Sequence, residues 1–143
     1  MSTDGTAFHR TKFKGNAVSQ TQIDGATLTD IVDGLKQFVA KEVVERHERH
    51  EALLNDPREM YDTAGCMRPE VVEHIRAVRR ASAEAGYFNL SVPEDIGGAG
   101  LGFLAYYEAW KAIHEVAGPH HWLSQFASSH WAVGPGGALG GMT

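Results

Sequence analysis

At 143 residues the chain is long enough to bury the core of one domain, and its formal net charge of −5 argues against charge-driven binding of nucleic acids or anionic membranes. Cys66 is the single cysteine, which excludes an internal disulfide and fits a reducing compartment. No run of about 18 apolar residues predicts a membrane span, and residues 1–25 lack the apolar run of a secretory signal, so we expect a cytoplasmic protein.

The N-terminal part divides into a polar arm and a long helix. Residues 1–25 are polar and aperiodic, which predicts a flexible arm; their basic residues would suit a mitochondrial transit peptide, but Asp4 and the lack of an apolar face argue against one. Apolar residues at helical spacing then predict a helix over about residues 27–53, with Thr27 as N-cap and Gly34 costing about 1 kcal/mol relative to alanine. These apolar residues are Leu28, Ile31, Leu35, Phe38, Val39 and Val43.

Three further helices follow a connector over residues 54–68. Pro69 suits the first turn of the second helix, and Gly86 suits the position just beyond its end. Because no segment alternates as a strand does, the sequence predicts an all-α domain over residues 26–143, an orthogonal or up-down bundle of about four main helices. The helices after the first cover about residues 69–85, 102–116 and 120–133.

The loop over residues 90–100 separates the second and third helices and organises the chain around it. Pro93 fixes its own φ, and Gly97, Gly98 and Gly100 permit positive φ or a close approach of backbone. Such glycines could be taken for a phosphate-binding loop, but the dinucleotide-binding fingerprint needs a preceding strand in a βαβ unit. Since the surroundings are helical, we predict a tight corner between two helices.

Charge is distributed unevenly along the chain. Charged residues are few beyond Leu90, and residues 116–143 contain none. A solvated helix normally carries a charged face, whereas this part of the chain contains Trp122, Phe126 and Trp131. We therefore expect something outside the 143 residues to cover part of this surface. The charged residues beyond Leu90 are Glu94, Asp95, Glu108, Lys111 and Glu115.

Eight histidines raise the question of a metal site. His47 and His50 lie three apart on the first predicted helix, whereas zinc proteases place theirs four apart, and no repeated Glu-x-x-His pair indicates a di-iron bundle. A charged run of this kind is usually a solvated face, so we assign no metal ligands, and a histidine-bearing metal bundle stays a third interpretation. Cys66 and the serines after residue 120 lack the context of catalytic nucleophiles.

The aromatic residues of the last two predicted helices fit either a packed core or the wall of a ligand pocket. Trp122, Phe126 and His130 are spaced i, i+4, i+8, so they would share one face of an α-helix. Aromatic stripes usually pack into a core, and the residues alone leave both interpretations open. The pattern of the third helix consists of Phe103, Tyr106, Tyr107, Trp110, Ile113 and His114.

The corner and its neighbours resemble the N-terminal helical domain of the acyl-CoA dehydrogenase family. Residues 92–100 carry the pattern Pro-Glu-x-x-Gly-Gly-x-Gly, a helix ending in Ala-Gly-Tyr precedes it, and segments 107–110 and 126–130 follow in the family's order. The resemblance covers roughly residues 27–135. It implies that a middle β domain and a C-terminal helical bundle complete the protein, usually in a tetramer.

The resemblance also implies a function in fatty acid metabolism. The family uses FAD to oxidise the Cα–Cβ bond of an acyl-CoA thioester, with a glutamate base that lies outside the N-terminal domain. No segment here matches the family's flavin-binding Thr-Glu-Pro-x-x-Gly-Ser-Asp or its base region, so we assign neither a catalytic residue nor a flavin ligand. Positions near Trp122, Phe126 and His130 match the wall of the family's acyl pocket.

Two functions are therefore carried forward. The first is the N-terminal domain of an FAD-dependent acyl-CoA dehydrogenase-like oxidoreductase, inactive without the middle and C-terminal domains. The alternative is a free-standing helical module that binds a flavoprotein partner subunit.

Overall fold

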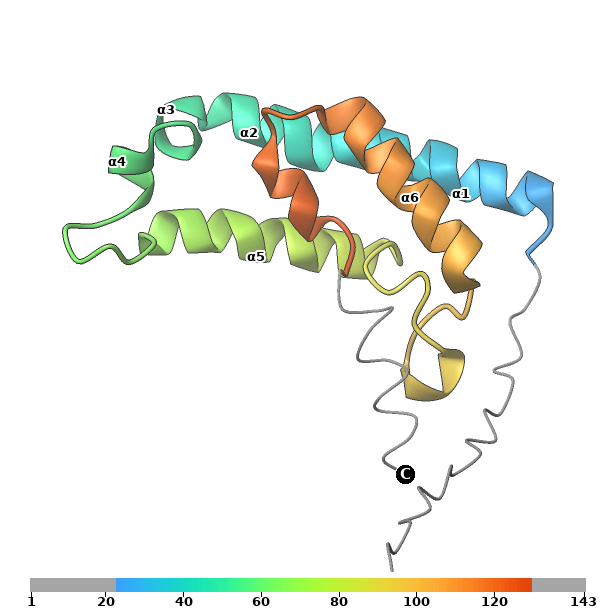
Figure 1. Cartoon of the computed structure of the whole chain (residues 1–143). Coiled ribbons are helices and arrows are strands. Elements are labelled where there is room, and N and C mark those ends of the chain that lie inside the picture. The colour runs from blue at the N-terminus through green and yellow to red at the C-terminus, as the bar shows by residue number, and fades with distance from the viewer. Residues whose placement is uncertain (1–22, 130–143) are drawn as a thin grey trace, which may run out of the picture.

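The structure is a computed structural model that describes residues 23–129, and this part of the chain consists of helices and loops (Figure 1). It contains no strand, and the isolated bridge between Tyr61 and Met67 builds no sheet. The predicted all-α class is confirmed. The elements are α1 (Gly25–Phe38), η1 (Val39–Val44, a π-helix), α2 (Glu45–Arg49), α3 (Glu51–Leu54), α4 (Pro57–Met60), α5 (Pro69–Glu84), η2 (Glu94–Ile96, a 3₁₀-helix), α6 (Gly102–Ala117) and η3 (Trp122–Phe126, a 3₁₀-helix).

The first predicted helix is a rod built from α1, η1 and α2 in succession, and α3 follows after an interruption at His50 (Figure 1). Its N-cap is Asp24 and not Thr27 as predicted, because the Asp24 carboxylate accepts hydrogen bonds from the Thr27 N–H at 3.0 Å and from the Thr27 hydroxyl at 2.6 Å. The structure also explains why residue 34 is a glycine, which the sequence alone did not. A Cβ at this position would lie 2.5 Å from the Tyr87 hydroxyl oxygen, so glycine makes room for that ring.

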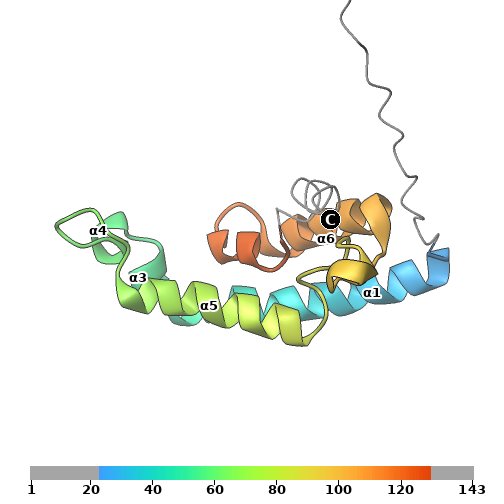
Figure 2. The same ribbon diagram turned by 90° about the horizontal axis from the view of Figure 1, so that it is seen from below.

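The core lies where α5, α6 and η3 pack against the rod. Figures 1 and 2 show α5 running along the rod and α6 crossing it obliquely, while α3, α4 and the following loop project at one end. Helix α6 contacts α1 and η1, and η3 contacts α5, η1 and α6. The fully buried side chains at the centre are Leu35, Val39, Val43, Val71, Val78, Ile113 and Leu123.

The glycine-rich loop forms the expected corner between α5 and α6. Its backbone bonds to itself: the Gly98 N–H donates to the Pro93 carbonyl at 3.0 Å, and the Gly100 N–H donates to the Val92 carbonyl at 2.8 Å. A Cβ on Gly98 would lie 1.9 Å from the Val92 oxygen, so only glycine fits there. The close approach that the composition predicted is an approach of the chain to itself.

The predicted fourth α-helix is wrong as far as the structure describes it. Residues 122–126 form the 3₁₀-helix η3, and residues 127–129 are not helical. Two hydrogen bonds draw the chain away from a helical path: the buried Ser82 hydroxyl donates to the Ala127 carbonyl, and the Ser129 N–H donates to the Phe88 carbonyl at 2.9 Å. His130 and Trp131 lie outside the described residues, as does most of the predicted N-terminal arm.

Candidate functional site

The structure brings Trp122 and Phe126 together on η3. Their rings meet edge to face with centroids 6.1 Å apart, and both side chains are half-buried against the core. The Trp122 indole N–H donates to the Leu54 carbonyl at 2.8 Å, which ties η3 to the end of α3. The Arg79 guanidinium of α5 lies 4.7 Å from the centroid of the Phe126 ring, in cation–π geometry. The pair therefore has packing partners within the chain and is still not fully enclosed.

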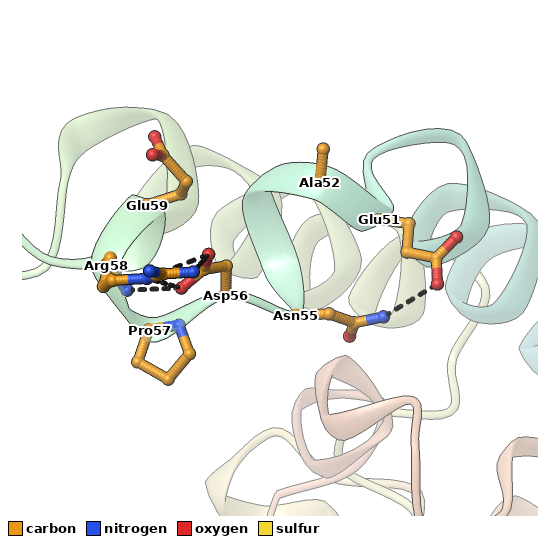
Figure 3. A pocket seen from close by; sticks show the side chains of 7 residues that line it. All are labelled: Glu51, Ala52, Asn55, Asp56, Pro57, Arg58 and Glu59. Carbon is orange, nitrogen blue, oxygen red and sulfur yellow. Dashed lines mark hydrogen bonds and ion pairs between the residues drawn. The ribbon is translucent and has the colours of Figure 1, made fainter.

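Two hollows lie near the α2–α3 end of the rod, and most of the residues that line each of them are of polar type. One, of about 470 Å³, is lined by three histidines, two glutamates and one asparagine, namely His47, His120, His121, Glu48, Glu51 and Asn55. The other, of about 780 Å³, is a shallow depression lined by residues 51, 52 and 55–59. Figure 3 shows that the Arg58 guanidinium in this depression forms an ion pair with the Asp56 carboxylate, at 2.7 Å. The Asn55 side-chain amide donates a hydrogen bond to the Glu51 carboxylate. Neither lining is suited to an acyl chain, and neither includes Trp122 or Phe126.

His47 departs from the prediction of a solvated charged face. Its side chain is only 1% exposed, and its Nε2 lies 2.7 Å from Asn55 Oδ1. The sequence did contain a signal for this burial, because His47 continues the four-residue steps of Leu35, Val39 and Val43. His50 is exposed as predicted. No group of three potential ligands within residues 23–129 is placed to hold a metal ion.

An exposed apolar surface lies on α6, within the charge-poor part of the chain that was expected to need a cover, and only the structure identifies its residues. Phe103, Leu104 and Tyr107, here called the α6 outer face, are 57%, 58% and 57% exposed. Most of the buried residues on the same helix are alanines, namely Ala105, Ala109, Ala112 and Ala117. The remaining buried residue is Ile113. These three large side chains thus point away from the core, while alanines allow close packing against the rod. Such a surface is typical of a site that contacts other protein or a ligand.

The other end of α6 is fastened by an ion pair. Lys36 Nζ lies 2.9 Å from Glu115 Oε2, which joins α1 to the last turns of α6. The hydrogen bond and charge of Lys36 lower the pKa of the Glu115 carboxyl, and the same contacts raise the pKa of Lys36. The charged residues of α6 are Glu108, Lys111 and Glu115, and its first six residues contain none.

Comparison with known families agrees with this geometry. The family model described as acyl-CoA dehydrogenase, N-terminal domain, matches residues 26–135, from α1 through η3 and beyond. The chain belongs to the acyl-CoA dehydrogenase family. No curated protein and no solved structure matched the chain. None of the helices within residues 23–129 of this acyl-CoA dehydrogenase domain is long and apolar enough to span a bilayer.

The glycine-rich corner of this acyl-CoA dehydrogenase domain does not form a phosphate-binding site for FAD, the cofactor that the family generally uses. The N–H groups of Gly98, Ala99, Gly100 and Leu101 all donate to carbonyl groups of residues 89–93. A phosphate cradle needs N–H groups that are free to face the ligand. The corner therefore does not fit the cofactor and serves as a joint between helices.

Proposed function

We propose that this chain is the N-terminal domain of an FAD-dependent acyl-CoA dehydrogenase-like oxidoreductase, which oxidises the Cα–Cβ bond of an acyl thioester. The family membership supports the reaction class, and the α6 outer face supports the need for a neighbour. That outer face is the observation that carries the proposal. Three adjacent large apolar side chains, each more than half exposed, cost free energy in water unless another surface covers them.

In this proposal the chain contributes shape rather than reacting groups. FAD, held by the remaining domains, accepts the hydride, and the base also belongs to those domains. Trp122 and Phe126 form part of the wall that holds the acyl chain and excludes water, and His130, assigned to the same wall from the sequence, lies outside the described residues. The anchoring of Trp122 to the Leu54 carbonyl suits such a wall, because a fixed indole defines where the cavity stops. Alone, the chain is inactive.

The intact enzyme would act on acyl-CoA as a homo-oligomer, by family analogy a tetramer, in the cytoplasm. The alternative is a free-standing module that binds a flavoprotein subunit. One observation favours it: the described residues already bury a core of their own, with Leu35, Val39, Val43 and Ile113 at 0% exposure. A domain with such a core can fold before it meets its partner.

Isolation of the native polypeptide that carries this sequence tests the proposal. We expect it to purify with one FAD per flavin-bearing unit and to reduce an electron acceptor in the presence of acyl-CoA. A longer polypeptide would identify the first function, and a separate flavoprotein subunit would identify the alternative. Native material without flavin and without acyl-CoA oxidation would refute both.

A further inference from the structure

Histidines from three segments gather around the junction of α2 and α3. The His50 ring contacts the His74 ring of α5 in a tilted arrangement, with ring centroids 4.2 Å apart and an interplanar angle of 46°. His47 meets His121 edge to face at 5.1 Å. The His121 Nδ1 lies 2.6 Å from the Ala117 carbonyl oxygen, so that nitrogen carries its proton. Of these contacts, the tilted ring contact between His50 and His74 joins the rod to α5.

His50 occupies the link between the two short helices. Its φ of −122° and ψ of 26° interrupt the rod, and its carbonyl accepts hydrogen bonds from the Leu53 and Leu54 N–H groups, each at 3.0 Å. The carbonyl of Leu54 in turn accepts the Trp122 indole N–H. A contact that holds His50 against α5 therefore also holds the start of α3 and, through it, the anchor of Trp122.

The charges around this pair oppose a second positive charge. Burial contributes most to lowering the pKa of His74 below its ordinary value of 6.5, followed by His50 and Arg46, with His47 as a smaller cause. Glu73, on α5 itself, acts in the opposite direction. Arg46 is paired with Glu42 at 2.9 Å and still lowers the pKa of His74. Near neutral pH the two rings can stay in contact because His74 is uncharged.

We propose that the contacting His50–His74 pair is an acid-sensitive clasp, which holds the α2–α3 junction to α5 at neutral pH and opens when both rings are protonated. Two imidazolium rings at this separation repel each other, and burial of one of them adds a desolvation cost. Opening frees the projecting end of the molecule that contains α3 and α4 (Figure 2). It also loosens the carbonyl to which Trp122 is bound, so acidification disturbs the candidate pocket wall.

The sign of the pH dependence follows from the lowered pKa. Above about pH 6.5 the folded and unfolded chains both carry neutral His74, and the clasp contributes its full stability. As the pH falls from 6.5 towards the lowered folded value, the unfolded chain takes up more protons than the folded one, so stability is lost. Below the folded value the loss levels off.

NMR titration of the histidine rings in the 143-residue chain tests the pair directly. We expect the midpoint of His74 to lie below 6.5 and to rise in His50→Gln, which removes an exposed ring and its charge. His114→Gln, which changes an exposed histidine on α6, should leave the midpoint unchanged. A His74 midpoint that is the same in the wild type and in His50→Gln would overturn the proposal.

Amide hydrogen exchange, corrected for the intrinsic pH dependence, tests the opening. Protection at the Leu53 and Leu54 amides should fall between pH 7.5 and pH 5 relative to protection in α6. The expected loss is about tenfold for each pH unit that separates the His74 titration midpoint in the closed clasp from that in the open clasp. This acid-dependent loss should disappear in His74→Gln. Equal losses in wild type and variant would overturn the proposal, and should His74→Gln not fold, the titrations of wild type and His50→Gln decide.

Discussion

Whether Gly34→Ala stabilises or destabilises the chain depends on a residue far away in the sequence, Tyr87, which contacts Gly34. In an exposed helix interior, glycine to alanine stabilises by about 1 kcal/mol. Here the new Cβ would stand 2.5 Å from the Tyr87 hydroxyl oxygen but 3.7 Å from Cζ, which is an ordinary contact distance. The Tyr87 ring cannot simply retreat, since it packs on Phe38 with centroids 5.5 Å apart. Overpacking of this kind costs about 1–3 kcal/mol, so Gly34→Ala should destabilise the chain by up to about 2 kcal/mol.

Removing the hydroxyl should reverse that sign. In a Tyr87→Phe background the nearest atom is at van der Waals distance, so Gly34→Ala should gain the helical advantage of up to about 1 kcal/mol. Urea unfolding of the four proteins of this double-mutant cycle measures the coupling, expected at about 1–3 kcal/mol. Gly34→Ala that stabilises the wild type, or that destabilises both backgrounds equally, would refute the reasoning.

Three further predictions concern η3 and the α6 outer face. Ser82→Ala should destabilise the chain by about 1–3 kcal/mol in urea unfolding, because the Ala127 carbonyl loses its buried donor; a loss under about 0.5 kcal/mol would contradict that bond's importance. Leu104→Ser should reduce binding of an apolar dye and change stability by less than about 0.5 kcal/mol, whereas undiminished dye fluorescence would place the exposed apolar surface elsewhere. In the complete enzyme, Phe126→Ala should shift kcat/KM towards longer or wider acyl chains, and an unchanged chain-length profile would remove Phe126 from the pocket wall; Trp122 is a poorer choice, since its substitution also removes the bond to Leu54.

The helices could be predicted from the sequence because each long one carries its own apolar period and a terminating signal. Pro69 and Gly86 bound α5 as expected, since proline fits a first turn and Gly86 adopts a φ of +82°. The corner was equally local, because its proline and glycines make hydrogen bonds only with near neighbours. Family membership followed from that same stretch.

The features that the sequence did not predict have a common cause, because each of them depends on residues far away in the chain. The end of η3 is set by the Ser82 hydroxyl, 45 positions earlier, so residues 120–133 read alone still look helical. The orientation of α6 is set by how closely the rod approaches, and only that packing selects Ala105 and Ala109 over Phe103 as the inward residues. Trp122 and Phe126 contact each other on a 3₁₀-helix in place of the predicted α-helix, and their role in a pocket wall stays a prediction.

The π-helical η1 has a consequence for the alignment of the buried side of the rod. Residues 35, 39, 43 and 47 follow one another in steps of four, and each such step advances about 40° beyond a full turn in a regular α-helix. The wider winding of η1 counteracts that precession, which is how Leu35 and His47 can both face inwards although twelve residues separate them. Ordinary α-helical winding of all six residues of Val39–Val44 would instead swing everything downstream, including the histidines, around the axis.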